Sequence, residues 1–211
     1  MLALDLRFFA IADYYLKHDV ESFKSQLSEA AELRNSLFLR YEKGEAIDDS
    51  YVSMLSYKSL FNALAANNRD VAKRLALNMG GREVLERKYD HPFDYVMGYT
   101  LRAFVLNELN EMERWLPKLV VACEKYKMRD FAGYAQVFQG ILEKNSLLAN
   151  EGFQSIIRGH LRQTKANRIF ANTADQILCV WGIGMANLAI SHQLQIAAIP
   201  PLLPGELIQM T

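Results

Sequence analysis

The sequence predicts an all-α fold, and three observations lead to that class. Apolar residues recur three and four positions apart along most of the chain, which is the spacing of one helix face. No segment alternates polar and apolar residues like a strand, and no Asn-Gly or Asp-Gly hairpin turn is present. The chain has 211 residues, of which 51% are hydrophobic, so a single domain over 1–211 can form a sizeable core without metal or disulfide support.

The first 50 residues predict a pair of helices. One helix spans about 2–17 and a longer one spans about 20–41. Asp19 precedes the longer helix, where a carboxylate caps free backbone N–H groups, and Gly44 is suited to end it. A polar, acidic turn over 45–50 then separates this pair from the rest of the chain.

Residues 51–192 predict antiparallel helical hairpins, which bring the expected total to about nine helices. Pro92 suits a first helical turn because its missing N–H needs no partner there. Asn110 and Glu113 have the spacing of a capping box, and Pro117 is expected either to kink its helix or to mark its true start. The expected helices span about 51–66, 69–79, 92–108, 111–126, 130–142, 147–164 and 173–191, with 83–89 as a short helix or a loop.

The helix over 173–191 is the one that we expect the others to surround. Thr173 with Gln176 is a start signal, and the residues that follow are apolar on nearly all sides. Gly182 and Gly184 lie in its middle. No strand precedes them and a third glycine is missing, so they indicate a closely crossing helix rather than a dinucleotide-binding loop.

One helix ending recurs: a leucine, a short polar turn and a new amphipathic helix. The turns repeat at intervals of roughly 36 to 47 residues, the range of helical-hairpin repeats. This predicts stacked antiparallel hairpins of a tetratricopeptide-like kind or, because the tetratricopeptide signature residues are absent, an irregular helical bundle. Residues 193–211 follow as a proline-rich tail. The endings are Leu64-Ala65-Ala66-Asn67-Asn68, Leu106-Asn107-Glu108-Leu109-Asn110 and Leu142-Glu143-Lys144-Asn145-Ser146.

Charge and cysteine content narrow the function classes. The 24 basic and 24 acidic residues give no net charge, whereas a nucleic-acid-binding protein usually has a basic excess, so we expect no direct nucleic-acid partner. Cys123 and Cys179 stand alone in apolar helix patterns, as buried thiols of a reducing cytoplasm do. Charges interrupt the start of the chain where a secretion signal is apolar, and no run reaches the ~18 apolar residues of a membrane span. We expect a cytoplasmic protein with no membrane partner.

No residue pattern predicts catalysis. None of the four histidines has another histidine, a cysteine or a carboxylate at a metal-site spacing, so we expect no metal, no cofactor and no enzymatic activity. A basic run over 158–168 predicts a solvated helix end; nucleic-acid contact is the alternative, although no aromatic residues are interleaved for stacking. The histidines are His18, His91, His160 and His192.

Two acidic groups are the candidate partner-binding residues. Helix capping is one explanation and covers Asp48, Asp90 and Asp94. The other explanation is an acidic surface that attracts a basic protein over long range, with a tyrosine that adds binding energy. The candidate residues are Glu42, Glu45, Asp48, Asp49, Asp90, Asp94 and Tyr95.

Over about residues 51–208 the chain resembles the all-α immunity proteins of bacterial polymorphic-toxin and contact-dependent inhibition systems. The resemblance rests on the recurring hairpin endings and on a closing pattern. That pattern is Asp175-x-x-Leu178-x-x-Trp181, then Leu188-Ala189, then Ile199-Pro200-Pro201 and Glu206-Leu207. The resemblance implies a cytoplasmic antidote that binds a cognate toxin domain, often a nuclease, blocks its active site or substrate surface, and performs no reaction. The acidic residues would then face a basic toxin.

Two other functions stay open at this point. Hairpin repeats also suit an adaptor or regulator that binds a peptide in a groove lined by the first helix of each hairpin. An all-helical enzyme or small-ligand sensor would need a deep pocket with convergent polar groups and a shifted pKa.

Overall fold

Ten α-helices make up most of residues 2–208, the part of the chain that the computed structural model describes. No strand is present within this part, so the predicted all-α class is confirmed, with one helix more than expected because 83–89 is helical. No helix of these residues combines the length and apolar character needed to cross a bilayer. The helices are α1 (Leu2–Lys17), α2 (Val20–Glu42), α3 (Tyr57–Ala65), α4 (Arg69–Asn78), α5 (Glu83–Tyr89), α6 (Pro92–Leu106), α7 (Leu109–Lys125), α8 (Ala132–Leu142), α9 (Ser146–Gln163) and α10 (Val180–Ser191). Short 3-10 turns connect them: η1 (Asp49–Val52), η2 (Met54–Ser56), η3 (Arg129–Phe131), η4 (Ala174–Gln176) and η5 (Gly205–Leu207).

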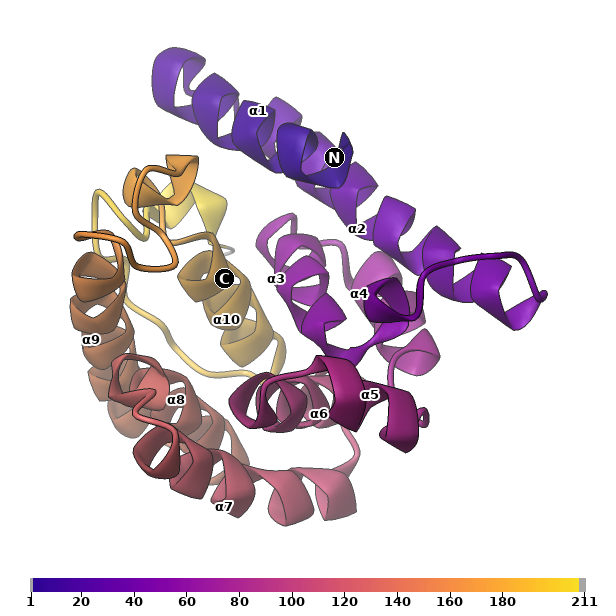
Figure 1. Cartoon of the computed structure of the whole chain (residues 1–211). Coiled ribbons are helices and arrows are strands. Elements are labelled where there is room, and N and C mark those ends of the chain that lie inside the picture. The colour runs from indigo at the N-terminus through magenta and orange to yellow at the C-terminus, as the bar shows by residue number, and fades with distance from the viewer. Residues whose placement is uncertain (1, 209–211) are drawn as a thin grey trace.

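The helices form a curved array of hairpins that is filled from the inside (Figure 1). The pairs α1–α2, α3–α4, α6–α7 and α8–α9 follow one another, and each pair packs against the next. On the inside of the curve, α10 packs against α3, α8 and α9. The array therefore has no empty inner groove along these helices.

The recurring helix ending has one backbone geometry. Asn67, Asn107 and Lys144 each have positive φ, between 52° and 55°. In each case the next residue donates its N–H to a carbonyl five residues back: for example, Asn68 N donates to Ala63 O at 3.0 Å. This is the Schellman motif, which pairs the last free carbonyls of a helix and turns the chain sharply.

The central position predicted for the last helix is confirmed. Every residue from Val180 to Ala189 is buried. A Cβ on Gly184 would lie 2.7 Å from Phe61 O, so its glycine permits α3 and α10 to cross at backbone distance. Buried Asn187 donates its side-chain N–H to Leu64 O at 2.9 Å across the same crossing.

The predicted start of this helix at Thr173 is wrong. Only a 3-10 turn forms over Ala174–Gln176, and α10 begins at Val180. The bond that would continue a helix here runs from Cys179 N to Asp175 O, but both groups have other partners. Cys179 N donates to Leu202 O at 3.0 Å, and Asp175 O accepts from the His160 side chain at 2.7 Å.

The predicted capping box of the sixth helix is also wrong. α7 begins at Leu109 rather than after Asn110, and no side chain caps its first turn. The preceding Schellman turn already satisfies Glu108 N through Ala103 O at 3.0 Å, so the next helix starts at once. Pro117 lies inside α7 and does not mark its start.

The packing of α8 on α9 is the closest in the molecule's outer array. A Cβ on Gly140 would meet Ala149 N at 2.8 Å, and one on Gly152 would meet Val137 N at 2.9 Å. The neighbouring atoms are backbone, which cannot rotate away. Gly152, which breaks the apolar pattern of α9, is therefore a contact residue.

Candidate functional site

The candidate acidic residues lie along one edge of the molecule, where the end of α2, turn η1, α5 and the start of α6 adjoin. η1 contacts both α2 and α5, and α5 contacts α6. Lys88 of α5 lies close enough to Asp48 and Asp49 for their charges to raise its pKa, after a larger effect of Tyr89. We call this region the acidic edge.

Partners within the chain engage the acids of the 42–49 segment. Glu45 forms an ion pair with Arg40 at 2.6 Å, and Asp49 accepts a hydrogen bond from the Tyr41 hydroxyl at 3.2 Å. Asp48 caps turn η1 by accepting from Ser50 N at 2.9 Å, which lowers the pKa of its carboxyl together with the Ser50 hydroxyl. The predicted capping role of Asp48 is confirmed. Arg40 therefore offsets the charge of Glu45, whereas Asp48 and Asp49 form no ion pair with a described residue.

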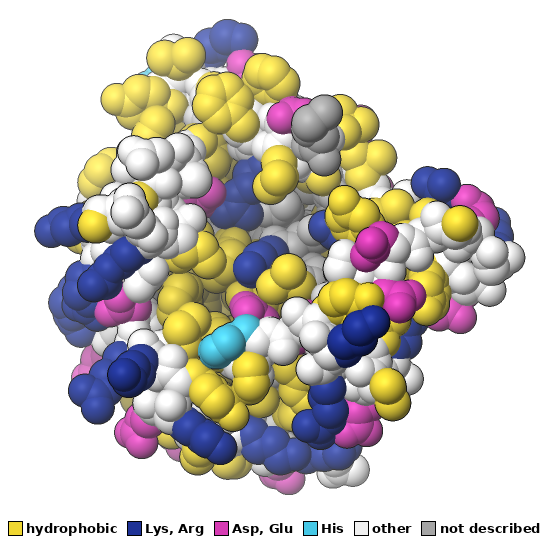
Figure 2. Space-filling model, viewed as in Figure 1, with side chains coloured by type: hydrophobic (Ala, Val, Ile, Leu, Met, Phe, Trp, Pro, Cys, Tyr) yellow, Lys and Arg dark blue, Asp and Glu magenta, His cyan; other side chains and the backbone are white. Residues whose placement is uncertain are grey.

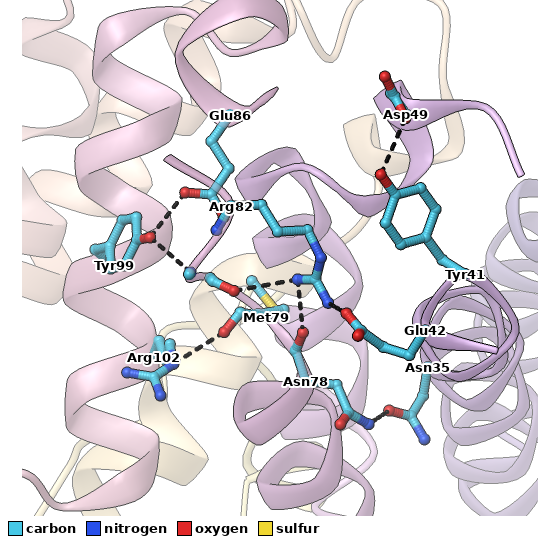
Figure 3. A network of polar contacts seen from close by, with 12 residues as sticks. Asn35, Tyr41, Glu42, Asp49, Asn78, Met79, Arg82, Glu86, Tyr99 and Arg102 are labelled. Atoms are coloured by element: carbon cyan, nitrogen blue, oxygen red, sulfur yellow. Dashed lines mark hydrogen bonds and ion pairs between the residues drawn. The ribbon is translucent and has the colours of Figure 1, made fainter. Parts of the chain in front are cut away.

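Arg82 connects the acidic edge to the helices beneath it (Figure 3). Its guanidinium pairs with Glu42 on α2 and donates to Asn78 O at 3.1 Å at the end of α4. It also lies over the Phe38 ring, 5.1 Å from the ring centroid. Arg82 itself is only 16% exposed, whereas Glu42 is 61% exposed and keeps one side towards solvent.

Asp90 and Asp94 accept hydrogen bonds that connect separate segments of the fold. The buried Asp90 carboxylate accepts from Met54 N at 2.9 Å and from Leu55 N at 3.2 Å, and burial raises its pKa. Asp94 accepts from the hydroxyl of buried Tyr57 at 2.8 Å. These bonds join the start of α6 to the turns before α3.

Tyr95 belongs to a partly exposed aromatic cluster. Its ring centroid lies 4.9 Å from that of Tyr99 and 5.7 Å from that of Trp115, and Arg87 lies over its outer face at 5.2 Å. Tyr95 and Asp90 help to line a shallow groove of about 300 Å³. The structure thus brings these two candidates together in one depression.

Helix α1 exposes more apolar surface than any pattern in the sequence indicates. Leu4 and Leu16 are 74% and 73% exposed on a helix whose other side is buried against α2. Hydrophobic side chains gather over α1 in Figure 2. We call this surface the α1 face; its exposed large residues are Leu2, Leu4, Phe8, Phe9, Tyr15 and Leu16.

Two shallow grooves border the α1 face. One, of about 510 Å³, lies between α1 and residues 172–177. The other, of about 380 Å³, is lined by Leu2 of α1, by α2 and by Asp48 of the acidic edge. The second groove makes the α1 face and the acidic edge neighbouring parts of one surface.

A deeper cleft of about 420 Å³ opens between α1, α2, α3 and residues 169–181. Figure 2 shows a hollow in this face, with Lys and Arg side chains inside it and hydrophobic side chains around it. Arg7, Arg34 and Lys58 bring positive charge to its lining, and Asp175 is the acid among the lining residues. Arg7 pairs with Asp175, so the excess charge belongs to Arg34 and Lys58.

The cations of the cleft are held by different means. Arg7 donates to Asn62 Oδ1 at 2.7 Å in addition to its pair with Asp175. Arg34 donates to Tyr51 O at 2.8 Å and has no ion pair within residues 2–208. Lys58 has neither a hydrogen bond nor an ion pair with a described residue and lies 5.8 Å from the centroid of the Tyr57 ring. Burial lowers the pKa of both Arg34 and Lys58.

Residue-by-residue analysis of the sequence did not find this cleft. Arg7 and Asp175 are 168 positions apart, and no local spacing connects them. The only signal was the closing pattern: Asp175 and Trp181 both belong to it, and both line the cleft. Sequence analysis had no means of identifying Arg34 and Lys58, which resemble ordinary surface cations of two amphipathic helices.

Other reactive groups have structural environments. Within residues 2–208, no three or more His, Cys, Asp and Glu side chains come together as metal ligands do. Cys123 and Cys179 are buried free thiols, as predicted, and burial raises the pKa of each to about 12. In the basic run, Arg162 and Arg168 pair with Asp130 at 2.5 Å and 3.1 Å.

No protein-family model, no curated protein and no solved structure matches this chain.

Proposed function

We propose that this protein is a non-catalytic binding protein that neutralises a cognate toxin domain by covering its active site or substrate surface. The α1 face is the observation that carries the proposal. Large apolar residues gathered on one exposed helix are typical of a protein–protein interface rather than of an isolated surface. Aromatic side chains such as Phe8, Phe9 and Tyr15 are enriched at such interfaces, and buried aromatic residues often supply much of the binding energy.

The acidic edge gives this surface its expected specificity. It adjoins the α1 face across the groove lined by Leu2 and Asp48. Glu42 and Glu45 keep 61% and 45% of their side chains exposed although each has an arginine partner. A basic nuclease domain can compete for such carboxylates and is drawn towards them before contact. The nature of the partner follows from the immunity-protein resemblance and from this charge.

Co-purification with the protein encoded immediately upstream tests the proposal. We expect a stable complex, and we expect cells that make the upstream protein to survive only when this chain is present. Phe8→Ser combined with Leu4→Ser is expected to abolish both. Leu147→Ser is the matched control, because Leu147 is 72% exposed on the distant α9. The absence of both a complex and a rescue would contradict the function, and equal binding by all variants would contradict the surface.

The alternative is a peptide-binding adaptor, which the hairpin-repeat spacing motivated. Such an adaptor needs a groove along the first helices of its hairpins. Here α10 packs on α3 and α8, and His192 at its end contacts Phe104 O of α6 at 3.1 Å. A peptide would have to displace α10, whose residues are almost completely buried.

A further inference from the structure

The cleft between α1, α3 and residues 169–181 has the properties of a ligand site, and none of the candidate partner-binding residues lines it. Its volume of about 420 Å³ is within the range of small-molecule sites. Such sites combine mostly apolar walls with a few polar groups that fix orientation. The cleft is built in this way: Leu4, Leu55, Ile169, Phe170 and Trp181 contribute apolar surface.

Two buried donors at the cleft have no partner. The Nε1–H of Trp181 and the Nε–H of Arg7 are both buried, and neither makes a hydrogen bond with any of residues 2–208. Both residues line the cleft. Buried polar groups in folded proteins are nearly always paired, so two unpaired donors in the walls of one cavity distinguish this region from an ordinary core.

The charge of the cleft favours an acceptor that is an anion. Arg7 and Asp175 neutralise each other, and Arg34 and Lys58 are left without an ion pair among the described residues. Asp94 and Asp90 are near enough to Lys58 to raise its pKa, yet burial outweighs them and lowers it. A half-buried ammonium in this state gains stability from an anion that replaces its lost hydration.

The exposed residues around the opening of the cleft indicate the chemistry of the ligand's uncharged part. Leu4 is 74% exposed, and Tyr51, Ile169 and Leu55 are exposed around the same opening. An inorganic anion would leave this apolar rim in water. A ligand with an apolar body would cover the rim while its charged group reaches Lys58 and Arg34.

We infer that this cleft binds a small organic carboxylate with an aromatic or branched apolar body, whose charged group lies between Lys58 and Arg34. The site shares Leu4 with the α1 face, but the binding of this ligand requires no partner protein. Its ligand would fill the cleft and bury the exposed rim.

Titration with 2-naphthoate tests the inference. The chain has two tryptophans, so a ¹⁵N correlation spectrum contains two indole signals, and the Trp115→Phe variant identifies the signal of Trp181. We expect 2-naphthoate to shift the Trp181 signal saturably. The neutral 2-naphthamide is expected to bind about tenfold more weakly or worse, because it has no negative charge to pair with the cations of Lys58 and Arg34. Acetate, which has no apolar body, is expected to cause no saturable shift.

Variants then locate the charge. Lys58→Met and Arg34→Met are each expected to weaken 2-naphthoate binding about tenfold. Leu4→Asp, at an exposed position of the rim, is expected to weaken it by repulsion of the carboxylate. Lys88→Met on α5 is the matched control, since Lys88 is exposed and lies outside the cleft lining.

Three results would overturn the inference: no saturable shift at millimolar 2-naphthoate, equal binding of 2-naphthamide, or an acetate effect of the same size. All are measured without a toxin, so their outcome is distinguishable from failure of the proposed function.

Discussion

The buried His160 and the half-buried His192 are expected to make the stability of the fold depend on pH. Neutral His160 donates through Nε2 to Asp175 O at 2.7 Å, and its buried Nδ1 has no hydrogen-bond partner within residues 2–208. His192 donates through Nε2 to Phe104 O at 3.1 Å. Burial lowers the pKa of both below the ordinary value of 6.5, because a second proton would place an unpaired charge in the interior.

We predict that the free energy of unfolding falls as pH falls below about 6.5. Below this pH the histidines of the unfolded chain bind protons, whereas those of the folded chain stay neutral until the pH approaches their lower pKa values. The stability present above about pH 6.5 is therefore lost over this range. The slope is at most about 1.4 kcal/mol per pH unit for each histidine. Urea unfolding at about pH 7.5 and 5.5 measures it. His192→Gln should reduce the slope and His18→Gln, at an exposed position, should not; an unchanged slope in both variants would contradict the assignment.

Substitutions of Asp90 and Asp48 should differ in their effect on stability, because Asp90 is buried and Asp48 is exposed. Asp90→Ala removes the acceptor of Met54 N and Leu55 N, and a buried N–H without a partner costs about 1–3 kcal/mol. In Asp48→Ala, water replaces the exposed carboxylate at Ser50 N, so we expect a loss of about 1 kcal/mol or less. Chemical denaturation compares the two. Equal losses would mean that Asp90 is not an anchor of the turns before α3.

At the scale of helices, backbone-to-backbone packing reverses the usual effect of replacing glycine. In a free helix, Gly→Ala gains about 1 kcal/mol. At Gly140 the added Cβ would lie 2.8 Å from Ala149 N and 3.0 Å from its Cα. We predict that Gly140→Ala destabilises the fold by about 1–3 kcal/mol. Gln154→Ala, at an exposed position of α9, should change stability by no more than about 0.5 kcal/mol, and a more stable Gly140→Ala would show that α8 and α9 do not pack this closely.

Most helices could be predicted from the sequence because their ends are determined locally. Asp19 caps α2 through Ser22 N at 2.9 Å, Asn145 caps α9 through Leu148 N at 3.1 Å, and Pro92 begins α6 as expected. Prediction failed where the start of a helix depends on groups that are distant in the sequence. Thr173 and Gln176 form a valid local start signal, but Leu202 and His160 take the hydrogen bonds that would extend the helix.

The surface acids illustrate a different limit. Charge along the sequence identified Glu42 and Glu45, but it could not reveal that Arg82 and Arg40 pair with them. Lys58 is isolated only because of how α3 lies against its neighbours. Local patterns therefore predict helices and charge, whereas the charge balance of a cleft is a property of the assembled fold.

At the scale of the whole molecule, α10 connects the second hairpin of the array with the last, because it packs on α3 as well as on α8 and α9. We predict one cooperative unfolding transition, as for a single domain. Trp115→Phe leaves Trp181 as a core probe, and Trp181→Phe leaves Trp115 as a probe on α7. In each variant the urea midpoint from fluorescence should equal the midpoint from circular dichroism. Separate midpoints would mean that the chain contains two units.

The association rate of the proposed complex depends on the charges of the whole surface. Glu45→Lys with Asp49→Lys should slow binding to a basic partner about tenfold at low salt, and the difference should shrink as salt screens the charges. Glu151→Lys is the control, because Glu151 lies at an exposed position of α9. Stopped-flow mixing measures the rates, and a salt-independent rate would contradict electrostatic attraction.

The place of α10 also affects synthesis. Ala65 ends α3 and Val180 begins α10, so the ribosome adds about 115 residues between them, which takes on the order of ten seconds at roughly 5–20 residues per second. Until α10 is made, the surfaces of α3, α8 and α9 that it covers in the folded protein stay uncovered as each helix emerges. Newly made chains should therefore be clients of holding chaperones, and translation speed over residues 66–179 should govern how much of the protein escapes aggregation.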